Sequence, residues 1–261
     1  MSHSLILIGS ALREQGFVHL PGFFSDAELA PVRAVVQRFH AAWRLEHEAL
    51  FRAGAINSAY LTARDVLDRA DRLCLFRFVA QQRVHALVAQ GLTEPAFMNT
   101  QLFFNPLNAA QANYWHRDMQ YTGMSLAQQQ AALARLEVLH LRVALNPEPG
   151  LELVPGSHRR WDTAQQLAIR LQQEGHRHNE SMAEAVAVPL QPGDLLIFSA
   201  NMLHRGLYGL DRLAFDMLYC EREPALLAFV REDCLPEPDM LCEIDCPQLF
   251  APPPTLEKPL P

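Results

Sequence analysis

A histidine and an aspartate stand two residues apart in the segment Tyr114-Trp115-His116-Arg117-Asp118. If this segment is a strand or the end of one, both side chains lie on the same side of the backbone, because side-chain direction repeats every two residues. One imidazole and one carboxylate in that arrangement can occupy two adjacent positions around a metal ion. Taken alone, however, such a pair more often forms a structural hydrogen bond.

A second histidine, His204, follows an apolar segment that a turn introduces. Residues 192–194 read Pro-Gly-Asp, which is a turn sequence, and residues 195–198 are all apolar. Two histidines and one carboxylate on one face of an octahedron leave three coordination positions open, as in non-haem Fe(II) oxygenases. A lone histidine is more often a core or surface residue than a ligand. Together with His116 and Asp118, His204 favours a metal site.

Two arginines near His204 could bind a carboxylate beside such a metal. Arg212 begins another strand-like segment, residues 211–215, and an inward guanidinium there could hold a carboxylate through two parallel hydrogen bonds. Arg205 is the competing candidate. Without its neighbours, Arg212 would be taken for an exposed arginine at the end of a strand.

The elements that must position these residues change type along the chain. Apolar residues at helical spacing follow a Pro-Gly turn at residues 21–22 and recur up to about residue 90, which predicts a helical layer. From Met98 onward the apolar runs are short and punctuated by Pro, Gly, Asn and Asp, as is typical of an antiparallel barrel or sandwich. Strands are expected at residues 16–20, 100–104, 138–145, 151–154, 195–198 and 213–219, and later helices at 125–136 and about 162–173.

No repeat and no linker divides the sequence. We therefore expect one domain over residues 1–261, with a helical part at about 1–95 and a strand-rich core at about 96–225. The proline-rich extension at about 236–261 is unsuited to helix or sheet, so we expect it to lie along the surface or to fray.

Composition excludes several classes of protein. The 261 residues are 49% hydrophobic and 20% charged, with a net charge of −7, which is typical of a soluble globular protein. The acidic balance, without a dense run of Lys or Arg, argues against a nucleic-acid partner. The sequence shows neither a secretory signal nor a bilayer-spanning run, so no membrane partner is expected.

The five cysteines indicate reduced thiols in a cytoplasmic protein rather than a disulfide scaffold, because their number is odd and their spacing sparse. A structural zinc site at Cys234, Cys242 and Cys246 is a weak alternative, since these residues contain no CxxC pair.

Several segments together resemble the phytanoyl-CoA dioxygenase (PhyH)-like family of Fe(II)/2-oxoglutarate-dependent oxygenases. Members typically begin with a Gly-Phe-Val segment, a Pro-Gly turn and an acidic-capped helix, as residues 16–39 do. The HxD pair, an Ala-Leu strand end at 144–145, a Gly-Leu-Glu-Leu-Val-Pro-Gly-Ser-His stretch at 150–158 and a Gly-Asp strand leading to a distal histidine at 193–204 follow in the family order. The resemblance extends from about residue 11 to 222.

The resemblance implies a mainly β fold with a helical layer, namely a cupin-like double-stranded β-helix or jelly roll. It implies that His116, Asp118 and His204 bind iron and that Arg212 holds the distal carboxylate of 2-oxoglutarate. Gln101 could assist, although a polar cross-strand pair explains it equally well.

The reaction that the resemblance implies consumes O2 and 2-oxoglutarate, releases succinate and CO2, and hydroxylates an unactivated C–H bond of a small molecule. Asp118 favours hydroxylation, because related halogenases lack this carboxylate. Desaturation or ring chemistry at the same centre stays open.

The substrate is defined only loosely by the sequence. His140 and Arg142 alternate with apolar residues, so they should face the barrel mouth or solvent, and an inward Arg142 would suit an anionic substrate. His158 is expected to shape its loop rather than to bind metal. Aromatic residues next to the HxD pair could line the pocket or pack in the core: Tyr114, Trp115 and Tyr121.

Three other functions were weighed. His116-Arg117-Asp118 resembles the start of a protein-kinase catalytic loop, but Gly123 stands where that loop needs Asn, and neither a Gly-rich loop nor DFG is present. A jelly-roll binding protein without turnover and a cupin-type isomerase or hydrolase with zinc or manganese are more serious rivals. The His116, Asp118 and His204 set together with Arg212 favours the oxygenase, since mere binding does not need open metal positions facing an arginine.

Overall fold

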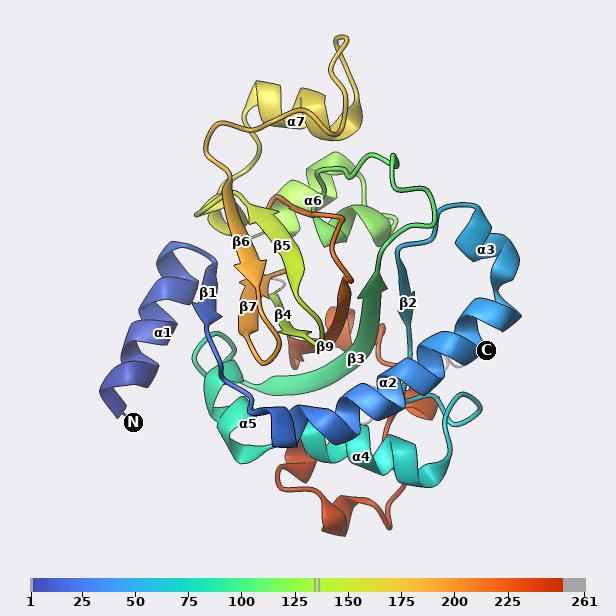
Figure 1. Ribbon diagram of the computed structural model, residues 1–261. Coiled ribbons are helices and arrows are strands. Elements are labelled where there is room, and N and C mark those ends of the chain that lie inside the picture. Colours follow the sequence, from blue (N-terminus) through green and yellow to red (C-terminus); the bar gives the residue numbers. More distant parts are fainter. Residues whose placement is uncertain (1, 134, 136, 251–261) are drawn as a thin grey trace, which may run out of the picture.

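Two antiparallel sheets form the centre of the molecule in the computed structural model, which describes residues 2–133, 135 and 137–250 (Figure 1). The larger sheet contains, in spatial order, β1 (Phe17–Leu20), β7 (Leu195–Ser199), β4 (Val138–Ala144), β9 (Leu213–Glu221), β3 (Pro95–Phe104) and β2 (Asn57–Ala59). The smaller sheet contains β6 (Val186–Leu190), β5 (Glu148–Leu153) and β8 (His204–Gly206). The strands predicted from residue 98 onward are confirmed, within a few residues at their ends.

Helices cover the outer face of the larger sheet (Figure 1). They are α1 (Ser2–Glu14), α2 (Asp26–Glu46), α3 (Glu48–Arg52), α4 (Arg69–Val79) and α5 (Gln82–Val88). The acidic-capped helix expected after the Pro-Gly turn is α2, which begins at a capping box formed by Ser25 and Glu28. Two expectations need correction. No helix was expected at residues 2–14, where α1 lies. The helical spacing that recurs up to about residue 90 ends in two helices, α4 and α5, which are separated at residues 80–81.

The remaining helices are short. They are η1 (Asp118–Tyr121), α6 (Leu126–Ala132), η2 (Ser157–Arg159), α7 (Ala164–Leu171), α8 (Pro224–Leu227), η3 (Glu232–Cys234), η4 (Leu241–Glu243) and η5 (Pro247–Leu249). The predicted helices at 125–136 and 162–173 correspond to α6 and α7, which are shorter than expected. Residues 134 and 136 of the first prediction lie outside the described residues. None of the described helices is long and apolar enough to cross a membrane.

Alternation along the central strands separates an apolar face from a polar one. On β4, Leu139, Leu141 and Val143 pack in the core shared with the helices, whereas His140 and Arg142 point into the space between the sheets. The neighbouring strand β9 continues the pattern, because Arg142 lies opposite Asp216 in the register. A row of charged side chains therefore runs along the inner face of the larger sheet.

The turn before β7 ties the first strand to the sheet. Asp194 accepts hydrogen bonds from the backbone N–H groups of Gly22 and Gln191, at 2.8 and 3.0 Å, and contacts the His19 ring at 2.9 Å. Gly193 has a φ of +91°, and a Cβ there would lie 2.3 Å from the carbonyl oxygen of Phe24. The Gly-Asp pair of the motif thus has a structural role, since it joins two turns that are distant in sequence.

The C-terminal segment corrects another expectation. Residues 236–250 neither fray nor lie loosely on the surface, because Met240, Ile244, Leu249 and Phe250 are buried in the main hydrophobic core. The Phe250 ring stacks at a tilt against Phe97 of β3, with 5.2 Å between the ring centroids. The expectation for residues 251–261 lies outside the described residues.

Candidate active site

His116, Asp118 and His204 come together between the two sheets. Oδ1 of Asp118 lies 3.6 Å from Nε2 of His116 and 3.5 Å from Nε2 of His204. In the part of the chain that the structure describes, no other group of three or more His, Cys, Asp or Glu residues could hold a metal ion. The three cysteines weighed as a zinc site therefore do not form one, and all five cysteines are free thiols.

The backbone places the two histidines side by side. His116 forms an isolated antiparallel bridge with His204, and each backbone N–H donates to the carbonyl oxygen of the other at 3.0 Å. Asp118 follows at the start of η1, where its N–H donates to the carbonyl oxygen of Ala200 at 3.2 Å. The HxD pair therefore lies at an isolated bridge rather than on a strand, but both side chains turn to one point as expected.

Both imidazoles are oriented through Nδ1. His116 Nδ1 lies 3.2 Å from the carbonyl oxygen of Tyr114, and His204 Nδ1 lies 3.0 Å from that of Met202. A carbonyl accepts from N–H only, so each Nε2 keeps its lone pair for a metal. Burial lowers the pKa of His116, and burial together with His116 lowers the pKa of His204 to about 3. Both rings are therefore neutral at neutral pH, which is the form that binds metals.

Asp118 has one free oxygen. His140 Nε2 lies 2.7 Å from Oδ2 of Asp118. His116 and His204 lie near the other oxygen, Oδ1. Burial would raise the pKa of Asp118, but attraction to His140 and the hydrogen bond from it keep that pKa far below its ordinary value. The site thus offers two neutral imidazoles and one carboxylate oxygen, and this donor set fits ferrous iron.

His140 belongs to a buried chain of charges. Its Nδ1 lies 3.3 Å from Asp216, and Arg142 bridges Asp216 and Glu148 with three hydrogen bonds of 2.7–3.1 Å. Burial would lower the pKa of His140, but the charges and hydrogen bonds of Asp118 and Asp216 raise it to about 9. His140 and Arg142 are 2% and 1% exposed, so the alternative that they face solvent is wrong.

A cavity of about 520 Å³ opens beside His116, Asp118 and His204. Arg212 lines it and is buried; its Nη1 donates to the carbonyl oxygen of Phe104 at 3.1 Å, and its Nε lies 3.4 Å from Glu148. Burial and the neighbouring Arg142 lower the pKa of Arg212 to about 10, so the guanidinium is still charged at neutral pH.

Arg205 points elsewhere. It follows His204 directly on β8, so strand alternation turns it to the opposite face. Its Nε pairs with Glu152, its Nη1 donates to the carbonyl oxygen of Asn179 at 2.7 Å, and its guanidinium lies 4.6 Å from the centroid of the Trp115 ring. Of the two arginines weighed in the sequence, the geometry presents Arg212 to the cavity.

The other residues singled out in the sequence divide between cavity and core. Gln101 lines the cavity opposite Asp216, and Tyr114 and Tyr121 line it near the His116 ring. Trp115 packs instead in a separate buried cluster, where its indole N–H donates to the carbonyl oxygen of Glu180 at 2.8 Å. His158 lies against Gly16, where an added Cβ would come within 2.5 Å of the ring, and it is not part of the metal cluster.

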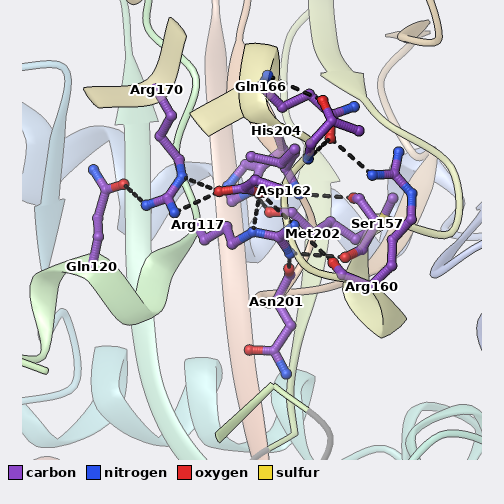
Figure 2. Close-up of polar contacts among 12 residues, drawn as sticks. Arg117, Gln120, Ser157, Arg160, Asp162, Gln166, Arg170, Asn201, Met202 and His204 are labelled. Carbon is purple, nitrogen blue, oxygen red and sulfur yellow. Dashed lines mark hydrogen bonds and ion pairs between the residues drawn. The ribbon is translucent and has the colours of Figure 1, made fainter. Parts of the chain in front are cut away.

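Arg117, between the two ligands of the HxD pair, is a residue whose role the sequence analysis missed. Figure 2 shows its guanidinium at the centre of a polar network. It donates to Asp162 at 2.7 and 2.9 Å, to the carbonyl oxygens of Ser157 and Arg160 at 2.8 and 3.1 Å, and to that of Asn201. The side chain is fully buried and links the HxD segment to the loop after β5 and to the segment that leads to His204.

Arg170 completes this network from α7. Its guanidinium donates to the second oxygen of Asp162 at 2.6 and 2.9 Å and to Gln120 at 3.3 Å (Figure 2). Asp162 is thereby held between two arginines, and its own side chain is fully buried. The sequence around position 117 contains no pattern that could have indicated this network, because its partners come from distant segments.

Comparison with known proteins was made for sequence families, curated proteins and solved structures. A family model described as "Phytanoyl-CoA dioxygenase (PhyH)" matches residues 12–207. The comparison with curated proteins gives no match.

Among solved structures, the "non-heme alpha ketoglutarate dependent epimerase SnoN from nogalamycin biosynthesis" is 20% identical, with 85% of this chain and 84% of that chain covered and a TM-score of 0.57. The corresponding "carbocyclase SnoK" is 17% identical, with 82% and 83% covered and a TM-score of 0.55. EctD from S. alaskensis with 2-oxoglutarate and 5-hydroxyectoine is 19% identical, with 81% and 74% covered and a TM-score of 0.55. At such identities the likeness shows the fold, and the predicted jelly roll with a helical layer is confirmed.

Proposed function

The chain belongs to the phytanoyl-CoA dioxygenase family, and from this premise we propose that it is an iron- and 2-oxoglutarate-dependent dioxygenase that hydroxylates an unactivated C–H bond of a small molecule. One observation carries the proposal: two neutral histidines and one carboxylate meet at the wall of a cavity that also holds the buried guanidinium of Arg212. The titles of related structures support the cofactors, since SnoN was crystallised with Fe3+ and alpha ketoglutarate and EctD with 2-oxoglutarate.

The proposed roles follow from the contacts. Nε2 of His116, Nε2 of His204 and Oδ1 of Asp118 would hold the iron, and Arg212 would bind the far carboxylate of 2-oxoglutarate, with Gln101 beside it. When bound, iron and 2-oxoglutarate supply an oxidation by O2 in which 2-oxoglutarate becomes succinate and CO2. The chain's own contribution is to orient the ligands, to keep Asp118 ionised through His140, and to exclude water from a buried cavity.

Hydroxylation is the proposed outcome because Asp118 supplies the carboxylate ligand. The structurally similar epimerase and carbocyclase show that this fold also carries other reactions. Product analysis of the first substrate found would decide between them.

The test is anaerobic titration of the protein with Fe(II) and 2-oxoglutarate, followed by exposure to oxygen and a succinate assay. We expect a charge-transfer absorption band that requires both additions, and succinate release that EDTA abolishes. Metal binding without the band, and without succinate, would favour a binding protein or a cupin-type isomerase or hydrolase instead.

Arg212→Ala and Arg205→Ala form a matched pair for the co-substrate anchor. Loss of hydrogen bonds to a charged group costs about 1.5–3 kcal/mol, so Arg212→Ala should raise the Kd of 2-oxoglutarate on the order of 10–100-fold. Arg205→Ala should leave that Kd within about twofold, because its guanidinium faces Glu152 on the other side of the sheet. The reverse order would transfer the role to Arg205.

A further inference from the structure

We infer that the substrate part of the cavity takes an uncharged, largely apolar molecule. This inference rests on the proposed function, because it assigns Arg212 to 2-oxoglutarate. The surface in question, called the apolar lobe below, consists of cavity-lining side chains from five segments: Met98, Met124, Val138, Leu218, Leu226 and Phe229.

The strand register places the apolar lobe at the opposite end of the cavity from Arg212. Cavity-facing residues on β4 run from Arg142 through His140 to Val138. Their neighbours on β9 change in the same direction, because Arg142 lies opposite Asp216 and His140 lies opposite Leu218. Within two residues along β4 and β9, the charged end therefore gives way to an end that is largely apolar, where Asn99 of β3 is a polar but uncharged neighbour of Leu218.

The metal ligands lie at the boundary between these two ends. Asp118 contacts His140, the middle residue of the β4 series, at 2.7 Å. A co-substrate that extends from the metal ligands toward Arg212 leaves the apolar lobe on the other side of them. Its walls then surround the position where a substrate C–H bond would face the metal.

The charged side chains that line the cavity leave no ionic partner for a substrate. Among the described residues that line the cavity, His140 and Arg142 already pair with carboxylates, and Asp216 accepts from both of them. Arg212 is assigned to 2-oxoglutarate, and the two histidines with Asp118 to the metal. An anionic substrate would find no unpaired cation, and a cationic substrate no unpaired carboxylate, so either would lose hydration without compensation.

The expectation that Arg142 suits an anionic substrate is not supported by this geometry. Its Nε and Nη2 donate to the two oxygens of Glu148, at 2.8 and 2.7 Å, and its Nη1 donates to Asp216. All three nitrogens of the guanidinium already donate to carboxylates, and these carboxylates are themselves buried. Arg142 therefore holds the charged end in place rather than contacting substrate.

The cavity volume and the position of Phe229 agree with a substrate of moderate size. About 520 Å³ lies within the range of about 300–1,000 Å³ found for small-molecule sites. Phe229 is 42% exposed and Tyr121 is 61% exposed, although both line the cavity. They mark its mouth, where an apolar substrate would enter.

Three naphthalene probes of equal size test the charge preference: 2-naphthylmethanol, 2-naphthoate and 2-naphthylmethylamine. Their fluorescence would be titrated anaerobically against the protein loaded with Fe(II) and 2-oxoglutarate, and against the metal-free protein. We expect the neutral alcohol to bind the loaded protein at least about tenfold more tightly than either charged probe. Equal or tighter binding of the carboxylate or the amine would overturn the inference.

Substitutions in the apolar lobe test whether the naphthalene alcohol binds there. Phe229→Asp, at the exposed mouth, should weaken binding of the alcohol about tenfold, and Leu218→Thr should weaken it as well. The matched control is Leu210→Asp, because Leu210 is 69% exposed and does not line the cavity. If Leu210→Asp weakened binding as much as Phe229→Asp, the probe would not be in the apolar lobe and the inference would fail.

The experiments distinguish failure of the oxygenase proposal from failure of the substrate inference. If the charge-transfer band forms with Fe(II) and 2-oxoglutarate but the probes show no preference, the substrate inference is wrong and the oxygenase proposal stands. If the band does not form while the metal-free protein still selects the alcohol in a way that Phe229→Asp abolishes, the oxygenase proposal is wrong and the neutral apolar lobe stands.

Discussion

His140 determines how Asp118 can meet a metal. The histidine is buried and stacks on Phe198, with 4.8 Å between the ring centroids. Its Nδ1 contacts Asp216 and its Nε2 contacts Asp118. Because Oδ2 of Asp118 accepts from His140, only Oδ1 faces His116 and His204. Under the proposed function, the carboxylate would then offer the metal one oxygen and leave positions open for co-substrate and oxygen.

Replacing His140 should loosen the metal site without removing a ligand. We expect His140→Leu to weaken Fe(II) binding about 10–100-fold, as is found when a partner of a metal ligand is lost. His140→Gln, whose amide N–H can still donate to Asp118, should recover most of the affinity. Competition with a chromophoric chelator measures the Kd, and thermal melting of the metal-free variants separates this effect from unfolding. Wild-type affinity in His140→Leu would show that Asp118 is oriented by other contacts.

That His116, Asp118 and His204 meet at one point could be predicted from the sequence, whereas the contacts of their partners could not. Spacing and strand alternation bring His116 and Asp118 to one side. The choice between Arg212 and Arg205 stayed open in the sequence, because the two arginines lie near strands of different sheets. The contacts of His140 with Asp118 and Asp216 join three separate segments, and a single sequence contains no pattern that reports such pairings. For this reason His140 was expected to contact substrate or solvent instead.

Among the elements, the two ligand segments are joined by Arg117. Its guanidinium binds backbone carbonyl oxygens on two other segments and a carboxylate at the start of the α7 region. Such a contact fixes the distance between the HxD segment and the residues before His204. It does so from the side of the backbone opposite to the metal ligands.

Arg117→Met should destabilise the protein and spread the metal ligands. The loss should be about 3–5 kcal/mol. Arg170 still pairs with one oxygen of Asp162, but the other oxygen and three carbonyl oxygens lose the buried donor. Urea unfolding of the metal-free protein measures this loss. The control Arg231→Met removes an exposed pair with Asp233 and should cost about 0–1 kcal/mol. Equal losses in the two variants would show that the Arg117 network contributes little.

The strands that could be predicted contain mostly apolar residues, whereas the strands that were missed include two that depend on pairing. The runs at β4, β7 and β9 are buried on both faces, so composition alone indicates strands. β2 has the sequence Asn-Ser-Ala and β8 the sequence His-Arg-Gly, which have little intrinsic strand preference. These short strands form because β3 and β5 offer them hydrogen-bonding edges.

For the whole molecule, the stability at alkaline pH depends on Glu137. This residue lies at the start of the β4 region, and its Oε1 accepts a hydrogen bond from the Ser199 hydroxyl. Burial, together with the nearby Glu221, raises the pKa of Glu137 to about 7 despite that hydrogen bond. Between the ordinary carboxyl pKa and about 7, the unfolded chain has released a proton that the folded chain retains. The free energy of unfolding therefore falls as the pH rises through this window.

Glu137→Gln should remove this pH dependence. The variant is expected to be more stable than the wild type by on the order of 2 kcal/mol at pH 8, and to differ little below about pH 4.5, where the glutamate is protonated in both states. Urea unfolding at several pH values from 4.5 to 8 measures the difference. Glu46→Gln, at an exposed position, is the control and should show no such trend. A stability difference that is constant with pH would contradict the assignment.

The central pairing of β3 with β9 has a consequence for biosynthesis. Pro95 at one end of β3 lies opposite Glu221, and the core that covers β3 is completed by Leu249 and Phe250. A polypeptide leaving the ribosome exposes the apolar strand at residues 95–104 long before its partners have been translated. Folds with such distant contacts form slowly, and their unpaired edges promote aggregation. Recombinant production should therefore benefit from slow translation at low temperature and from chaperone co-expression.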